Sequence, residues 1–296
     1  METGQSAKAL PLTNSRIGLL GCGDIGTRLY ALLERQGAEV TAIRRHIDGI
    51  KHLHAKAMDF ADAASVGLLK DFAFDYVVIT LVPDRTEPNR EAAYQKGYVD
   101  NLTRILSHLD PSKLKRIFWV SSTSVYAQTD NQWVDESSEA NPQSVTGKLL
   151  REAENVLEAS PIDSTVVRFS GIYRSDRYRY LDKLKAHQLP AKATTNYFMN
   201  RIHVDDCARL LAFLLEKAQK GAVDGLYNGT DSHPVDYETF VNFLSDKMQL
   251  PLNDDMVADA PSSFKKIRNN KIVDAGFRFN YPSYQEGLVP LFHLYQ

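Results

Sequence analysis

The stretch RIGLLGCGDIG, residues 16–26, determines the fold that we expect for this chain. It begins with an apolar run, Arg16–Leu20, typical of a buried β-strand, and it continues into glycines spaced as GxGxxG. Leu29, Leu32 and Leu33 follow at helical spacing, which predicts a helix directly after the glycine turn. A strand, a tight turn and a helix in this order form the first half of a βαβ unit.

The glycine turn is placed where a bound dinucleotide needs it. A second β-like run, Glu39–Ile43, follows Gly37, a residue typical of helix ends, and completes the βαβ unit. In such a unit the glycines let the backbone approach a pyrophosphate, and the amides at the start of the helix bind the anion. The alternative is a packing turn without a ligand. We expect a dinucleotide site that includes Gly21, Gly23, Asp24, Ile25 and Gly26.

The end of the second strand indicates which dinucleotide binds. An NAD enzyme usually has an acidic residue there, which bonds the ribose hydroxyls. This chain has Arg44 and Arg45 instead, and the planar guanidinium group pairs well with a 2′-phosphate. We therefore expect NADP in preference to NAD; the alternative is that both arginines only solvate a strand end. Asp59 is a candidate contact to the adenine edge, with a turn or helix cap as its alternative role.

Strands and helices continue to alternate along the chain. The runs predict strands over Tyr76–Leu81, Arg116–Ser121 and Ser164–Phe169 and helices over Glu91–Leu109 and Lys148–Ala159. Because the strands are apolar along nearly their whole length, they predict a parallel sheet covered on both faces. The expected fold class is α/β, a doubly wound parallel (Rossmann) sheet with a smaller C-terminal substrate lobe. We expect an N-terminal tail over 1–15, an NAD(P)-binding Rossmann domain over 16–170, and a substrate lobe over 171–296, of which 201–216 packs back on the Rossmann domain.

Composition argues against several classes of function. The formal net charge is −2 and 24% of residues are charged, so no strong field attracts nucleic acid or acidic membranes. Cys22 and Cys207 are far apart and no Cys/His spacing suits zinc, so we expect no metal site and no disulfide. Residues 1–15 lack the pattern of a signal peptide, and no apolar stretch reaches about 18 residues. We expect a cytoplasmic protein with a small-molecule partner and no nucleic-acid or membrane partner.

Three later segments carry a resemblance to a known family. They are VSSTSVY at Val120–Tyr126, RFSGIY at Arg168–Tyr173 and RIHVDDCA at Arg201–Ala208. With these segments the chain resembles the extended short-chain dehydrogenase/reductase family, which includes nucleotide-sugar epimerases and dehydratases. The resemblance covers nearly the whole chain, and it implies further cofactor contacts at Thr80, Leu81, Ser121, Phe169 and Ile172.

The chain departs from the family at the catalytic YxxxK, which should fall within Pro142–Glu154. One reading frame puts Thr146 at the tyrosine and Leu150 at the lysine; the other puts Ser144 and Lys148 there. Neither frame yields the pair. This pattern resembles an atypical subgroup of the family that keeps the cofactor fold and lacks the usual catalytic tyrosine.

Other residues are candidates for the remaining chemistry. Ser122 stands at the family's serine position and could hydrogen-bond a substrate carbonyl or hydroxyl group. Tyr126 offers the nearest aromatic hydroxyl for acid/base work, with packing as the alternative. A threonine hydroxyl is a poor acid or base near neutral pH, so Thr146 could orient a substrate or a water molecule but cannot replace the catalytic tyrosine. We expect His203 to fix a loop through hydrogen bonds.

Two functions fit these observations. One is an NADP-binding oxidoreductase or epimerase/dehydratase-like enzyme that acts on a hydroxyl or keto group of a sugar-like substrate, such as a nucleotide-sugar. The other is a catalytically reduced NADP(H)-binding regulator or redox sensor that acts through a protein partner. The resemblance also implies a homodimer formed by the helices over 91–109 and 148–159. A basic and aromatic cluster could grip a diphosphate, or it could be a solvated surface; its members are Tyr173, Arg174, Arg177, Tyr178, Arg179, Tyr180 and Lys183.

Overall fold

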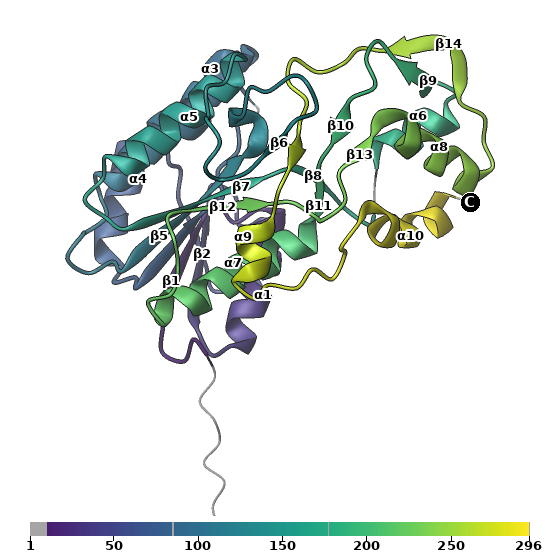
Figure 1. The fold of residues 1–296 in the computed structure, drawn as a ribbon. Helices are drawn as coiled ribbons and strands as arrows, with labels where there is room; N and C mark the ends of the chain where they lie inside the picture. The colour runs from purple at the N-terminus through teal and green to yellow at the C-terminus, as the bar shows by residue number, and fades with distance from the viewer. Residues whose placement is uncertain (1–10, 85, 177, 296) are drawn as a thin grey trace, which may run out of the picture.

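A seven-stranded parallel sheet forms the centre of the computed structural model, which describes residues 11–84, 86–176 and 178–295 (Figure 1). The strand order is β12-β7-β5-β4-β1-β2-β3. The strands are β1 (Arg16–Leu20), β2 (Glu39–Arg44), β3 (Ala55–Ala57), β4 (Tyr76–Ile79), β5 (Arg116–Ser122), β7 (Ser164–Phe169) and β12 (Leu226–Gly229). The expected α/β doubly wound fold is confirmed. Of the expected tail, residues 1–10 lie outside the described part of the chain.

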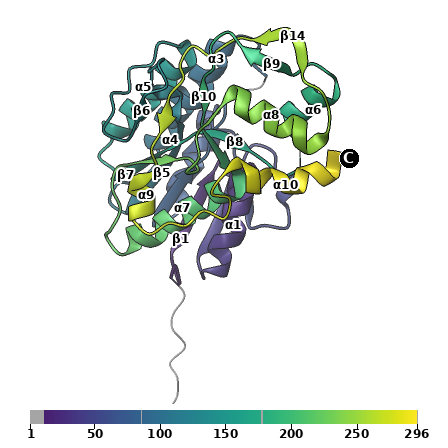
Figure 2. The same ribbon diagram turned by 45° about the vertical axis from the view of Figure 1, so that its right-hand side comes forward.

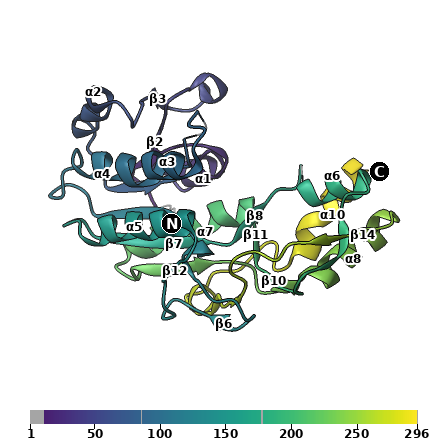
Figure 3. The ribbon, with the colours of Figure 1, turned by 90° about the horizontal axis from the view of Figure 1, so that it is seen from above.

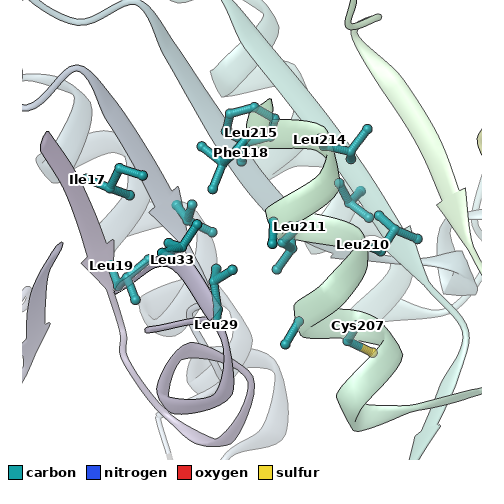
Figure 4. Packing of buried hydrophobic residues seen from close by; sticks show 14 of the residues in the cluster. Ile17, Leu19, Leu29, Leu33, Phe118, Cys207, Leu210, Leu211, Leu214 and Leu215 are labelled. Atoms are coloured by element: carbon teal, nitrogen blue, oxygen red, sulfur yellow. The ribbon is translucent and has the colours of Figure 1, made fainter. Parts of the chain in front are cut away.

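Helices cover both faces of this sheet because successive side chains of each strand point to opposite faces. On one face, Ile17 and Leu19 of β1 pack in the same cluster as Leu29 and Leu211 (Figure 4). On the other, Leu20 joins a separate buried cluster with residues of several further helices. The first face is covered by α1 (Asp24–Arg35) and α7 (Val204–Gln219), and the second by α3 (Arg90–Tyr94), α4 (Asn101–Leu106) and α5 (Val145–Glu158).

The helix predicted over Glu91–Leu109 is interrupted in its middle. A π-helical turn, η3 (Gln95–Asp100), separates α3 from α4, and the helix ends at Leu106. Here the loop after β4 runs against the helix, and a Cβ on Gly97 would lie only 2.6 Å from the carbonyl oxygen of Val82. Single π-helical turns occur frequently at functional sites. This one places a tyrosine, Tyr98, at the edge of the sheet where the strands end.

A small lobe, defined by α6, α8, α10, β9 and β14, lies to one side of the sheet (Figures 1 and 2). It has its own buried cluster, which includes Tyr237, Phe240 and Leu288. The two-stranded ladder of β8 and β11, together with the start of α7, connects it to the sheet (Figure 3). The elements here are β8 (Gly171–Tyr173), α6 (Arg179–Lys185), β9 (Pro190–Ala193), β10 (Phe198–Met199), β11 (Arg201–His203), β13 (Val235–Asp236), α8 (Tyr237–Met248), β14 (Asn253–Ala258) and α10 (Tyr284–Tyr295).

Part of the range 171–296 belongs to the main sheet and its covering helices. Strand β12 pairs with β7, with Leu226 opposite Val166, and α7 packs along α1. The elements of residues 171–296 are therefore divided between the small lobe and the main sheet. The remaining short elements are η1 (Asp48–Ile50), α2 (Ala63–Val66), η2 (Gly67–Asp71), η4 (Thr123–Val125), β6 (Trp133–Val134), β15 (Lys266–Ile267) and α9 (Asn270–Asp274). None of the helices in the described residues combines the length and apolar character that a membrane span requires.

Candidate cofactor and substrate site

A cavity of about 980 Å³ opens at the carboxyl ends of the parallel strands. Open α/β sheets bind ligands in this crevice, and the volume suits a large ligand. Of the residues predicted from the sequence, those that line the cavity are Gly21, Gly23, Asp24, Ile25, Arg44, Arg45, Asp59, Thr80, Leu81, Ser121, Ser122, Phe169 and Ile172. Gly26, Tyr126 and Thr146 are not among the described residues that line it.

The three glycines of the turn have different geometric roles. Gly21 has φ +83°, and a Cβ there would lie 2.9 Å from the carbonyl oxygen of Thr80. A Cβ on Gly26 would lie 3.1 Å from the Sγ of Cys22, so this glycine allows α1 to pack closely on the turn. At Gly23 the nearest atom, the carbonyl oxygen of Gly21, would be 3.7 Å from a Cβ, so the protein itself leaves this position uncrowded. The turn thus has the tight bend, the close helix packing and the free backbone surface that a diphosphate needs.

Two arginines lie at one end of the cavity. Arg44, at the end of β2, donates from Nη1 to the carbonyl oxygen of Cys22 at 3.3 Å. Within the described residues, neither Arg44 nor Arg45 forms an ion pair with a carboxylate. Asp59 lines the same end, where its Oδ1 accepts from the amide of Ala61 at 3.0 Å. The guanidinium groups of Arg44 and Arg45 form no ion pair with Asp59 or another carboxylate in the described chain, so they remain available to an anionic group.

Two serine hydroxyls lie at the other end, on neighbouring strands. Ser122 is the register partner of Phe169, so Ser122 and Ser170 stand at the carboxyl ends of β5 and β7. The Ser122 Oγ accepts from the amide of Ser124 at 3.2 Å. The Oγ of Ser170 is buried and has no hydrogen-bond partner within the described chain. A buried hydroxyl without a partner is costly, so a ligand or water oxygen at this point would satisfy it.

The predicted catalytic residues are not all brought together. Tyr126 is fully buried, its hydroxyl donates to Oδ1 of Asn228 at 3.0 Å, and its ring lies beneath Arg168. Thr146 lies in the first turn of α5, half-buried, and α5 contains no tyrosine. Leu150, one turn further along this helix, does line the cavity.

Several lining residues were not predicted from the sequence. Tyr98 and Asn101 reach the cavity from the π-helical turn and from α4. Arg174, which the sequence had already indicated as a member of the basic and aromatic cluster, reaches it from the segment after β8. Burial raises the pKa of the Tyr98 phenol further above neutral, so the phenol is protonated and able to donate a hydrogen bond. The local sequence around Tyr98 and Asn101 resembles an ordinary amphipathic helix, so no signal singled them out.

His203 fixes a loop by hydrogen bonds. Its Nδ1 accepts from the amide of Asp205 and caps α7, while its Nε2 lies 2.5 Å from the Oγ of Ser175. Burial lowers the pKa of His203, which favours the neutral ring. Of the basic and aromatic cluster, Tyr173 and Tyr178 are buried in the small lobe and Arg177 lies outside the described residues. No group of three or more His, Cys, Asp or Glu side chains in the described chain is placed to hold a metal ion.

A buried carboxyl group just after β12 predicts that the free energy of unfolding depends on pH. Asp231, 1% exposed, follows β12, and burial raises its pKa to about 8. The folded protein therefore keeps a proton that the unfolded chain releases near pH 4, so Asp231 lowers stability progressively between about pH 4 and pH 8. We expect Asp231→Asn, which keeps the Oδ1 that accepts from the His233 amide, to raise the free energy of unfolding by about 1–3 kcal/mol at pH 8.

Urea denaturation at pH 5, 6.5 and 8 measures this effect. The advantage of Asp231→Asn should grow with pH, whereas the exposed Asp254→Asn should show no such trend. A difference that stays constant across this range would contradict the assignment of a buried, protonated carboxyl group to Asp231.

Together the sheet order, the glycine turn and the cavity define an NAD(P)-binding Rossmann protein. The chain belongs to the NAD(P)H-binding family, whose model matches residues 21–217. No curated protein matches the chain. A structure from Methylobacillus flagellatus, described as an NAD-dependent epimerase/dehydratase, is 30% identical, with a TM-score of 0.78 over 93% of this chain and 96% of the other.

Two more distant structures share the fold. A short-chain dehydrogenase/reductase superfamily protein from Agrobacterium tumefaciens with bound NAD is 16% identical, with a TM-score of 0.79 over 94% of this chain and 96% of that one. The UDP-glucuronic acid 4-epimerase from Bacillus cereus, in complex with UDP-glucuronic acid and NAD, is also 16% identical, with a TM-score of 0.77 over 95% and 98%. The chain therefore has the fold of NAD-dependent epimerases and short-chain dehydrogenases/reductases.

Proposed function

We propose that this protein is an NADP(H)-dependent oxidoreductase or epimerase that acts on a hydroxyl or keto group of a sugar-like substrate. The observation that carries the proposal is one continuous cavity lined by two arginines that have no carboxylate partner in the described chain, by the glycine turn and by two serines. These three parts lie in the order in which a 2′-phosphoadenosine, a diphosphate and a nicotinamide follow one another in NADP.

The arginines support NADP in preference to NAD. Arg44 and Arg45 stand where a carboxylate would bond the ribose hydroxyls of NAD, and neither is neutralised by a carboxylate in the described chain. A 2′-phosphate would supply the missing negative charge and accept charge-assisted hydrogen bonds.

The serine end supports a hydroxyl or keto substrate. The bound nicotinamide would supply the hydride acceptor or donor. Ser122 and Ser170 would orient the substrate oxygen by hydrogen bonds, and the protonated phenol of Tyr98 offers a further donor in the same cavity. Because α5 contains no tyrosine, this arrangement differs from a mechanism that takes its proton donor from that helix.

Calorimetric titration of the purified protein with NADP, NADPH, NAD and NADH, repeated with UDP- and GDP-sugars present, tests the proposal. We expect tight binding of NADP(H), strengthened by one class of sugar nucleotide, which would also identify the substrate class. Tight cofactor binding that is indifferent to every sugar would instead favour a regulator that reads the NADP/NADPH ratio. Absence of dinucleotide binding would reject both functions.

A further inference from the structure

An ion pair connects the segment after β8 to the glycine turn. Arg174 follows β8, and its Nη1 lies 2.9 Å from Oδ2 of Asp24 in the first turn of α1. Both residues line the cavity, although they lie 150 positions apart in the sequence. The guanidinium group of Arg174 therefore lies beside the backbone surface that would receive a diphosphate.

Asp24 makes this position electrostatically unusual. A carboxylate in the first turn of a helix is stabilised by the helix dipole, but here it would also repel the phosphates of a dinucleotide. Arg28 partly neutralises it, with Nε 3.0 Å from Oδ1 of Asp24, but Arg28 also pairs with Asp205 of α7. A further cation beside Asp24 would favour a diphosphate bound at the turn, and Arg174, which lines the cavity and pairs with Asp24, supplies one.

The backbone of Arg174 is held while its side chain is accessible. The next residue, Ser175, bonds the buried ring of His203 and donates to the carbonyl oxygen of Gly287 at 3.4 Å. The Arg174 side chain is 45% exposed and also pairs with Asp176, which is itself exposed. The side chain can therefore reorient toward an arriving anion without movement of the segment that carries it.

We propose that Arg174 is shared between Asp24 and the dinucleotide diphosphate, so that the cofactor itself strengthens the contact between the segment after β8 and α1. The planar, five-donor guanidinium group can bond a carboxylate and a phosphate at the same time. This assigns a diphosphate-positioning role to a residue that lies far from the glycine motif in sequence. It builds on the proposed function, because it requires a dinucleotide in the cavity.

Titration of Arg174→Ala with NADPH and with adenosine 2′-phosphate tests the proposal. We expect NADPH to bind about tenfold more weakly than to the wild type, because a charge-assisted bond is lost. Adenosine 2′-phosphate has no diphosphate, so its affinity should not change. Arg179→Ala is the matched control, since Arg179 is an exposed arginine of α6 that does not line the cavity, and its variant should bind both ligands as the wild type does.

The Asp24→Asn background separates direct contact from simple neutralisation. If Arg174 contacts the diphosphate, Arg174→Ala should still weaken NADPH binding about tenfold when Asp24 is replaced. If Arg174 only masks the Asp24 carboxylate, the loss should disappear, and the proposal is overturned. Wild-type affinity in Arg174→Ala also overturns it and leaves the proposed function intact. If the wild type binds no dinucleotide, both this proposal and the proposed function are overturned. If the wild type prefers NADH, NADH and adenosine replace NADPH and adenosine 2′-phosphate in the same comparison, and the same outcomes decide it.

Discussion

Arg44→Asp is expected to weaken NADPH binding about a hundredfold while NADH binding is kept or slightly improved. Arg44 lies at the end of β2 without a carboxylate partner in the described chain, and charge-assisted hydrogen bonds to it contribute about 1.5–3 kcal/mol. Each 1.4 kcal/mol corresponds to about tenfold in affinity. The new carboxylate would also repel a 2′-phosphate and could accept from the ribose hydroxyls of NADH. Calorimetry with both cofactors measures the change in preference.

Two variants control for this result. Arg44→Gln removes the charge without adding a carboxylate, and we expect its affinity for NADPH to lie between those of the wild type and Arg44→Asp. Lys70→Asp changes the net charge by the same amount at an exposed position outside the cavity lining, and it should leave the preference as it is. If Arg44→Asp keeps the wild-type preference, Arg44 does not recognise the 2′-phosphate and the choice of NADP is wrong.

Glu154→Ala is expected to lower the free energy of unfolding by about 3–5 kcal/mol. Glu154 of α5 is fully buried, and both its oxygens bond Arg168 of β7, at 3.0 and 2.7 Å. It also accepts from the Oγ of Ser121 at 2.6 Å, next to the cavity. Removal of the carboxylate would leave a buried guanidinium group without its bidentate partner, which is the costly way to break a buried pair.

Urea denaturation of three variants identifies the cause of this loss. Glu158→Ala removes a 55% exposed carboxylate that pairs with Arg151, and we expect a change below about 1 kcal/mol. The double variant Glu154→Met with Arg168→Met replaces the whole pair by apolar side chains, and it should recover most of the stability. If Glu154→Ala and Glu158→Ala lower the free energy of unfolding by equally small amounts, the Glu154–Arg168 pair does not behave as the buried ion pair that the structure indicates.

The local elements of the Rossmann sheet could be predicted because their patterns are local. The apolar run Arg16–Leu20 has the pattern of a buried strand, and the leucines of α1 recur at the spacing of a helix. Strand Ser164–Phe169 has the predicted bounds. Breaks in a period were harder to predict. The π-helical turn includes Gly97, which lies against the loop after β4, and no helical pattern shows this contact between segments.

The cofactor end of the site was also easier to predict than the substrate end. The glycine turn and Arg44 are positioned by one continuous βαβ unit, so their spacing in sequence fixes their spacing in space. Tyr98, Ser170 and Arg174 come from three separate segments and meet only when the sheet and small lobe are assembled. No sequence pattern indicated that Asn228, in β12, would bind the hydroxyl group of Tyr126.

The position of β12 at the sheet edge affects when the sheet can finish folding during synthesis on the ribosome. Its partner β7 ends at Phe169, whereas β12 ends at Gly229, so about a fifth of the chain must be synthesised between the two strands. Until then β7 presents an open edge to other nascent chains, and the face later covered by α7 stays exposed. The described residues that line the cavity end at Val204, so they are synthesised before β12 can close this edge of the sheet.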